Sequence, residues 1–161
     1  CEQRDMPRLI LIVDGMTDPR NLGACLRSAN AAGVDAVLLP KRRIAPLSST
    51  VMRVAQGGCE ELTLVETGNI ARTLKWLHER GVWIIGADAT GRSIWESNVD
   101  NRSIALVIGD EGKGLRRLTK ELCDAMVGIP MFGTVESLNV SVATGVLLFE
   151  LRRKTTHTAS C

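Results

Sequence analysis

Polar side chains mark the start of an otherwise apolar segment near the end of the chain, SLNVSVATGVLLFE at 137–150. Ser137 or Asn139 can cap a helix that begins here, because a side-chain oxygen accepts a bond from a free backbone N–H. Capping accounts for one polar residue, but Ser137, Asn139 and Ser141 are three. Polar groups at a buried helix start need hydrogen-bond partners, which a bound ligand can supply. We therefore expect a ligand site at this helix start, with the apolar remainder in the core or at a subunit interface.

A second candidate is the glycine-rich stretch GDEGKG at 109–114, which follows the apolar run IALVI. Its glycines resemble a phosphate cradle, but the carboxylates of Asp110 and Glu111 would repel phosphate. The spacing also matches neither the P-loop nor the Rossmann fingerprint. The stretch favours a ligand with little negative charge that the backbone approaches closely, and a plain strand-to-helix turn is the alternative.

A third candidate lies near the amino terminus, where a helix has a clear start and end. Asp18 can cap it, Pro19 suits its first turn and Gly33 can close it. Its apolar stripe consists of Leu22, Cys25, Leu26, Ala29 and Ala32, which leaves Gly23, Arg27 and Asn30 on another face. Asn21 lies in the opening turn, near the carboxyl end of the preceding strand, where open α/β sheets bind ligands. The alternative is that Asn21 only starts the helix and Arg27 is a surface cation.

These candidates depend on elements that alternate along the chain. Short apolar runs predict buried strands at 9–14, 36–39, 62–65, 82–87, 104–109 and 126–130. Helical patterns lie between and after them, near 19–32, 48–56, 70–80, 115–123 and 138–153. The alternation predicts an α/β fold with a mostly parallel sheet flanked by helices.

Composition narrows the classes of function. The chain has 161 residues, which suits one compact domain. No apolar run approaches the roughly 20 residues of a membrane-spanning helix, and we expect a cytoplasmic protein with no membrane partner. The 5 cysteines are widely spaced and the 2 histidines, His78 and His157, are too few for a histidine-based metal site or a Ser-His-Asp triad. We therefore expect no metal, and cysteines that are reduced and mostly structural.

The net charge is only +2, so it does not by itself indicate a nucleic-acid partner. The basic residues are nevertheless clustered at 41–43, 116–117 and 152–154. Each cluster can contact phosphate, and each can equally be a solvated face.

The three candidates together carry a family resemblance. DPRNLGACLRSANAAG at 18–33, ALVIGDEGKGL at 105–115 and IPMFGTVESLNVSVATGVLLFE at 129–150 resemble, in order, the three motifs of the SpoU or TrmH-like RNA ribose 2′-O-methyltransferases of the SPOUT superfamily. Among members, the chain looks most similar to the bacterial 23S rRNA guanosine 2′-O-methyltransferases. The resemblance implies methyl transfer from S-adenosylmethionine to a ribose 2′-hydroxyl of RNA.

The same resemblance implies a trefoil knot at the C-terminal part of the fold and a homodimer. It implies a catalytic domain at 9–154, preceded by a linker remnant at 1–8 and followed by a tail at 155–161. Many members carry a separate amino-terminal RNA-recognition domain, which we expect to be missing here. The implied cofactor-binding residues are Gly86, Ala87, Gly109, Glu111, Gly114, Ile129, Met131, Ser137 and Leu138.

Transferred onto the matching positions, the family's catalytic residues are Asn21, Arg27, Glu111, Ser137 and Asn139. A guanidinium is a poor proton acceptor, so we assign Arg27 to a substrate phosphate and to the developing alkoxide, and leave the general base open. Glu111 would order the loops of the site. Ser137 and Asn139 would position cofactor and substrate.

Two alternatives remain at this point. One is a tRNA ribose 2′-O-methyltransferase of the same family, which differs only in the RNA it modifies. The other is a non-catalytic RNA-binding module that kept the fold, against which the complete set of motif residues argues.

Overall fold

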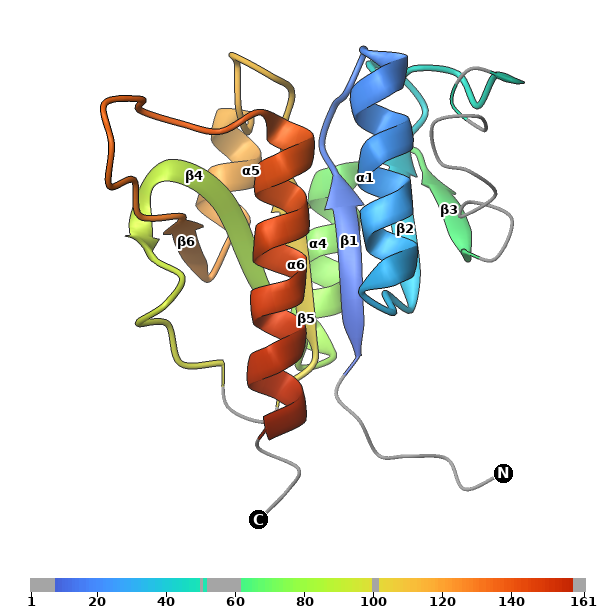
Figure 1. Cartoon of the computed structure of the whole chain (residues 1–161). Helices are drawn as coiled ribbons and strands as arrows, with labels where there is room; N and C mark the ends of the chain where they lie inside the picture. Colours follow the sequence, from blue (N-terminus) through green and yellow to red (C-terminus); the bar gives the residue numbers. More distant parts are fainter. Residues whose placement is uncertain (1–7, 50, 52–61, 100–101, 158–161) are drawn as a thin grey trace.

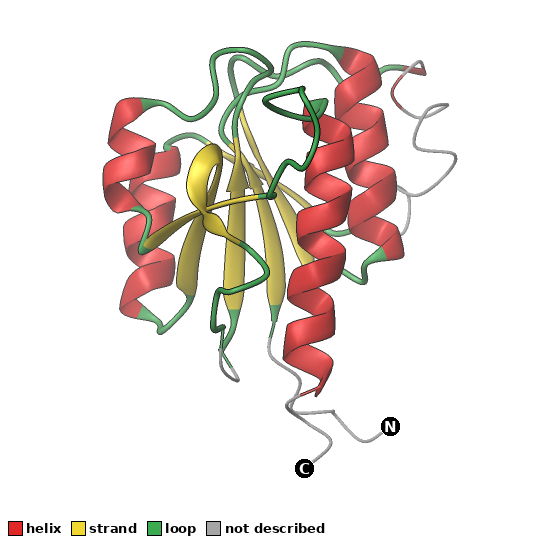
Figure 2. Ribbon diagram, turned by 60° about the vertical axis from the view of Figure 1, so that its left-hand side comes forward, coloured by secondary structure: helices red, strands yellow, loops and turns green. Residues whose placement is uncertain are grey.

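The computed structural model describes residues 8–49, 51, 62–99 and 102–157, and it has three layers. A 6-stranded sheet lies between helices on both faces (Figures 1 and 2). The strands are β1 (Leu9–Val13), β2 (Ala36–Pro40), β3 (Leu64–Thr67), β4 (Trp83–Ser93), β5 (Ile104–Ile108) and β6 (Ala125–Gly128). The described helices are α1 (Pro19–Ala31), α4 (Ile70–Glu79), α5 (Arg117–Leu122) and α6 (Val140–His157).

All paired strands run parallel, in the order β3-β2-β1-β5-β4-β6. Each central strand is a continuous apolar run because both of its faces are covered. Alternate residues of β1 enter opposite halves of the core, with Leu9, Leu11 and Val13 on the face of α1 and α6, and Ile12 on the face of α4. The α/β prediction with a mostly parallel sheet is therefore confirmed.

The sheet order places β1 directly beside β5, with Val13 opposite Ile108 in the register. The chain proceeds from β1 outward to β2 and β3, and the later strands lie on the other side of β1. Such a reversal of strand order leaves a crevice outside the carboxyl ends of the two strands, where parallel α/β proteins bind ligands. Asn21 lies in the first turn of α1, which follows β1, and Glu111 lies in the loop after β5, so two of the three motifs meet at this edge.

Strand β4 is longer than predicted, because it continues from Ala87 to Ser93. The extension is polar and partly exposed, so the sequence pattern at 88–93 is that of a loop. It nevertheless pairs with β6 a second time, after a register shift, with Arg92 opposite Val127 and Ser93 opposite Gly128. Contact with β6, and not a local apolar pattern, keeps this segment extended.

Other boundaries differ less. Strand β6 ends at Gly128, two residues before the predicted end, and α6 continues to His157, beyond the predicted end at 153. The helix predicted at 48–56 falls mostly on residues 50 and 52–61, outside the described residues. The trefoil knot and the division of the chain into 1–8, 9–154 and 155–161 remain predictions. Within the described ranges, no helix is both long and apolar enough to cross a membrane.

Candidate functional site

Helix α1 begins and ends as its sequence predicts. The Asp18 side chain accepts a hydrogen bond from the backbone N–H of Arg20 over 2.8 Å, and Pro19 occupies the first turn. Gly33 follows the helix with a φ of +68°, a conformation that glycine adopts without steric cost. This fixed start places Asn21 at the carboxyl edge of the sheet, where only 7% of its surface is exposed.

The three motifs meet at a small network of side chains. Asn21 Nδ2 donates to Glu111 Oε2 over 3.0 Å, and Asn139 Nδ2 donates to Glu111 Oε1 over 3.1 Å. Asn139 Nδ2 also lies 3.4 Å from Asn21 Oδ1. One carboxylate therefore holds together the starts of α1 and α6, which are 118 residues apart in the sequence.

Asn139 also caps helix α6. Its Oδ1 accepts bonds from the backbone N–H of Ser141 over 2.9 Å and from the Ser141 hydroxyl over 2.5 Å. The amide group thus uses its oxygen for the helix and its nitrogen for the network. Asn139 is the cap and Ser141 supports it, whereas the Ser137 side chain lines a pocket.

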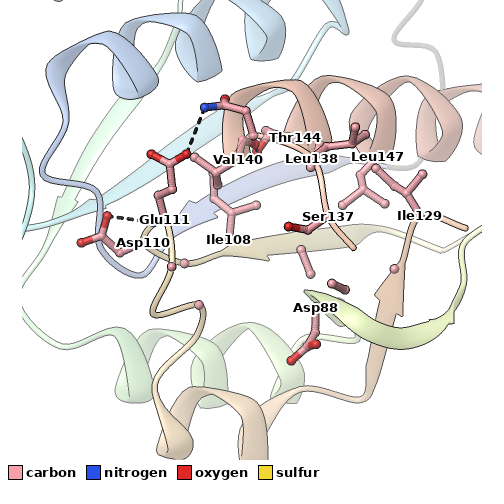
Figure 3. A pocket seen from close by; sticks show the side chains of 18 of the residues that line it. Asp88, Ile108, Asp110, Glu111, Ile129, Ser137, Leu138, Val140, Thr144 and Leu147 are labelled. Atoms are coloured by element: carbon pink, nitrogen blue, oxygen red, sulfur yellow. Dashed lines mark hydrogen bonds between the residues drawn. The ribbon is translucent and has the colours of Figure 1, made fainter. Parts of the chain in front are cut away.

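The pocket has a volume of about 660 Å³ and opens beside this network (Figure 3). Its walls come from the middle of β4, the ends of β5 and β6 with the loops that follow these two strands, Lys120 of α5 and the first turns of α6. Figure 3 shows Asp88, Glu111, Ser137 and Leu138 disposed around it. Of the residues predicted to bind cofactor, the pocket is lined by Ala87, Gly109, Glu111, Gly114, Ile129, Met131, Ser137 and Leu138.

Gly86 does not line this pocket. A Cβ atom at Gly86 would lie 2.6 Å from Met126 Sδ and 2.9 Å from Leu115 Cδ1, so the residue allows side chains of β6 and the loop before α5 to pack against β4.

Gly109 shows the close backbone approach predicted for the glycine-rich stretch. A Cβ atom there would lie 2.2 Å from the backbone carbonyl of Gly114. The loop at 109–114 can fold back on itself only because this position has no side chain.

That loop is held at both ends. The backbone N–H of Gly114 donates to the Asp110 carbonyl over 2.8 Å, and the N–H of Glu111 donates to Asp110 Oδ1 over 3.0 Å. Arg116, just after the loop, donates to Asp14 through its backbone N–H at 3.1 Å, its Nε at 3.0 Å and its Nη2 at 2.5 Å. The end of the glycine-rich loop is thereby tied to the end of β1.

Asp14 was not among the predicted site residues, although it is the last residue of the first predicted strand, 9–14. It is 2% exposed. Burial raises the pKa of Asp14, but the hydrogen bonds and positive charge of Arg116 outweigh burial and hold that pKa below its ordinary value. Asp14 is therefore an ionised, buried anchor for the loop that carries Glu111.

Asp88 and Lys120 are two further pocket residues that the sequence analysis missed. Lys120 Nζ lies 3.2 Å from Asp88 Oδ2. Hydrogen bonds from the backbone and side chain of Thr90, aided by Lys120, lower the pKa of Asp88. For Asp88, the available sequence signal was a carboxylate directly after an apolar strand, at the edge of the sheet that binds ligands. The sequence offered no signal for Lys120, because only tertiary folding brings α5 to β4.

Arg27 lies outside the pocket. Its side chain is exposed on α1, as its helical spacing predicts, and it makes no hydrogen bond or ion pair with any residue in the described ranges. The structure therefore brings Asn21, Glu111, Ser137 and Asn139 together and leaves Arg27 at the surface, on the helix that starts with Asn21.

Of the described cysteines and histidines, Cys25, Cys123 and His78 do not line this pocket. Burial raises the pKa of the Cys25 thiol to about 11 against an opposing hydrogen bond with Thr144, and burial with nearby carboxylates raises that of Cys123 to about 11. Both thiols are uncharged near neutral pH, as structural cysteines are. No group of residues suited to binding a metal ion occurs in the part of the chain that the structure describes.

The fold and the site thus define a parallel α/β protein whose pocket is lined by β4, β5, β6 and the start of α6. The model of the SpoU rRNA methylase family matches residues 8–149. The chain belongs to this family, which confirms the resemblance carried by its three motifs.

The chain is 53% identical over 154 residues to the 23S rRNA (guanosine-2′-O-)-methyltransferase RlmB of Neisseria meningitidis serogroup B. That alignment covers 95% of this chain and 61% of the relative, so the chain spans about three fifths of the relative's length.

Two solved structures share the fold. The SpoU methyltransferase AviRb of Streptomyces viridochromogenes, in complex with AdoMet, superposes with a TM-score of 0.85 at 26% identity, over 96% of this chain and 63% of AviRb. A TrmH/SpoU tRNA modifying enzyme of A. aeolicus superposes with a TM-score of 0.83 at 26% identity, over 96% of this chain and 80% of that enzyme.

Proposed function

We propose that this protein transfers a methyl group from S-adenosylmethionine to a ribose 2′-hydroxyl of RNA, at a guanosine of 23S rRNA. The observation that carries the proposal is the Asn21–Glu111–Asn139 network, in which residues of all three family motifs meet beside one pocket. The 53% identity to a relative named as a 23S rRNA guanosine methyltransferase supports the choice of substrate.

The pocket fits the proposed cofactor in size and charge. Ligand pockets for molecules of this class enclose roughly 300–1,000 Å³, and this one has about 660 Å³. It is lined by four carboxylates, of Asp88, Asp110, Glu111 and Glu136, and by two lysines, Lys113 and Lys120, so its net negative charge suits a positively charged sulfonium and disfavours a nucleoside triphosphate. The pocket-lining members of the predicted cofactor set would hold the molecule, with Gly86 acting only through the packing of β4. When bound, S-adenosylmethionine supplies an activated methyl group.

The chain's own residues position the reacting groups. Both oxygens of Glu111 accept a bond from an asparagine amide, so Glu111 fixes the geometry of the loops and is not a free proton acceptor. Ser137 orients the ligands from the wall of the pocket. Arg27, exposed and unpaired among the described residues, is available for an RNA phosphate and for the negative charge that develops on the ribose oxygen. The general base is not assigned.

Helix α6 supports the proposed homodimer. Leu147, Leu148 and Leu151 are buried within the subunit, whereas Val142 and Phe149 are each 52% exposed. Exposed apolar side chains on a helix of the core suit a second copy of the chain. Cytoplasmic location, the knot, the 9–154 catalytic domain and an additional RNA-recognition domain belong to the same proposal.

A tRNA substrate is the second candidate, because the A. aeolicus neighbour is described as a tRNA modifying enzyme. Ribose-methylation mapping distinguishes the candidates. Ribosomal and transfer RNA are compared from cells with and without the gene, with the full-length gene restored as control. Loss of one 23S guanosine mark is the expected result. Loss of a tRNA mark would show that the substrate is tRNA. If no mark is lost in either RNA, the result would favour a non-catalytic binding module.

A further inference from the structure

The three basic clusters, at 41–43, 116–117 and 152–154, differ in whether their side chains have partners within the subunit. Arg116 binds Asp14, and Arg117 Nε lies 3.2 Å from Glu121 Oε1. In the last cluster, Arg152 donates to the carbonyls of Ala32 and Gly33, Arg153 binds Glu150, and Lys154 donates to the carbonyls of Trp95 and Ser97. The charges of these two clusters therefore have partners within the subunit itself.

Lys41, Arg42 and Arg43 are different. All three are exposed, and none of their side chains makes a hydrogen bond or ion pair with a residue in the described ranges. Among the described residues, no partner therefore compensates their three positive charges at short range. A concentration of free cations on a rigid surface attracts a polyanion.

The backbone of this cluster is held in place. The N–H of Met16 donates to the Arg43 carbonyl over 2.8 Å, and the N–H of Ala45 donates to the Met16 carbonyl over 2.7 Å. Arg43 has a φ of +59°, the left-handed region that a residue with a side chain rarely adopts. Such a conformation persists where surrounding structure dictates it, and strained positions gather at functional sites.

The cluster also lies at the edge that carries the site. It follows β2 at the carboxyl end of the sheet, and in Figure 1 this segment lies near the start of α1. A Cβ atom at Gly15 would lie 3.8 Å from Arg43 Cβ and 4.0 Å from Arg43 Nη1, so Arg43 flanks the loop between β1 and α1. Arg20 and Arg27 are also exposed, on α1, the helix that this loop precedes.

We propose that Lys41, Arg42 and Arg43 bind phosphates of the RNA strand next to the target ribose, and that the clusters at 116–117 and 152–154 do not. The inference rests on the proposed function for the identity of the polyanion. It places the RNA backbone on the α1 side of the site, with the cofactor pocket on the β4 and β6 side. Phosphate contacts of this kind release counterions, so the affinity depends on salt concentration.

The test uses the full-length protein with two matched double variants. Lys41→Gln with Arg42→Gln removes two charges from the free cluster and leaves the backbone of Arg43 unchanged. Arg117→Gln with Arg153→Gln removes two charges from the paired clusters. Binding to protein-free ribosomal RNA is measured by filter retention from about 50 to 200 mM salt, together with kcat, KM and thermal unfolding.

The free-cluster variant is expected to raise the Kd and KM for RNA by about tenfold and to reduce the log–log salt slope by about 2, with kcat unchanged. The paired-cluster variant is expected to stay within about twofold of wild type. Equal weakening by both variants, or no weakening by the first, would overturn the assignment. If wild type binds RNA but methylates none, the proposed function fails, while the comparison of RNA binding still decides the surface.

Discussion

The side-chain amide of Asn139 lies 3.1 Å from Glu111 Oε1, although 28 residues separate them in the chain. The other oxygen of the same carboxylate accepts a bond from Asn21 over 3.0 Å. An ionised carboxylate can only accept hydrogen bonds, and each asparagine amide offers it a donor. Both oxygens of Glu111 therefore have a partner without any proton transfer. This network joins the loops that line the pocket to the helix that carries Arg27.

Replacing Glu111 by Gln should disrupt this network. The new amide nitrogen would face a donor from Asn21 or Asn139, and an unmatched polar contact of this kind costs about 1–3 kcal/mol. We expect single-turnover methyl transfer to fall by about 10- to 100-fold. Glu121→Gln, which alters an exposed glutamate paired with Arg117, is the control. Full activity of the Glu111 variant would contradict the role of the network.

Asn139 has two separable roles, which two variants distinguish. Asn139→Asp keeps an oxygen that can cap α6 but brings a second carboxylate against Glu111. Asn139→Ala removes both the cap and the network contact, and loss of a cap costs about 1 kcal/mol. We expect both variants to lose methyl transfer, measured with labelled cofactor, and only the Ala variant to lose capping stability in denaturant unfolding. An active Asp variant would show that the donor contact to Glu111 is dispensable.

Arg27→Ala should abolish methyl transfer while the pocket still binds ligand. Arg27 does not line the pocket, so calorimetry should show binding of S-adenosylhomocysteine within about twofold of wild type, whereas kcat falls by about 100-fold or more. Arg72→Ala removes an exposed arginine from α4, on the opposite face of the sheet, and serves as the control. Substantial turnover by the Arg27 variant would remove this residue from the catalytic machinery.

The Asp14–Arg116 pair predicts a specific dependence of stability on pH. The pKa of Asp14 is lowered in the folded state, so the pair stabilises fully above the unfolded value of about 3.9 and loses its contribution as the pH falls through the folded pKa. Asp14→Asn should cost on the order of 2 kcal/mol at pH 7. Urea unfolding should show this difference shrinking below about pH 4. The pKa values of Asp88 and Glu150 are also lowered, but both carboxylates are present in wild type and in the Asp14→Asn variant. Their contribution therefore cancels in the difference between the two unfolding free energies.

A methyl group at Gly109 should displace the glycine-rich loop. The added Cβ would lie 2.2 Å from the Gly114 carbonyl, and backbone atoms cannot yield as a flexible side chain can. Overpacking of this kind costs about 1–3 kcal/mol, so Gly109→Ala should weaken S-adenosylhomocysteine binding by about tenfold or more in calorimetry. Gly133→Ala is a matched control, since its Cβ would meet nothing within 4 Å. Equal affinities of the two variants would show that the loop does not shape the pocket.

Much of the fold could be predicted because its determinants are local. The central strands are covered on both faces and therefore appear as short apolar runs, as in Ile104–Ile108. Helix α1 carries its own cap, first-turn proline and terminal glycine, so its boundaries followed from Asp18, Pro19 and Gly33. The outer half of β4 was missed because its polar residues gain strand conformation only from pairing with β6.

For the site, residue types and spacing identified the available side chains, through three motifs and the capping chemistry of polar residues. Which of these side chains meet follows from the packing of the strands and helices. In the folded chain, Asn139 is the cap, Arg116 binds Asp14 across 102 residues, and Gly86 lies outside the pocket wall. Among the described residues, 41–43 is the basic cluster whose charges have no partner. Residue type and spacing control interactions within a turn or two, whereas partners this far apart depend on the order in which the strands pair.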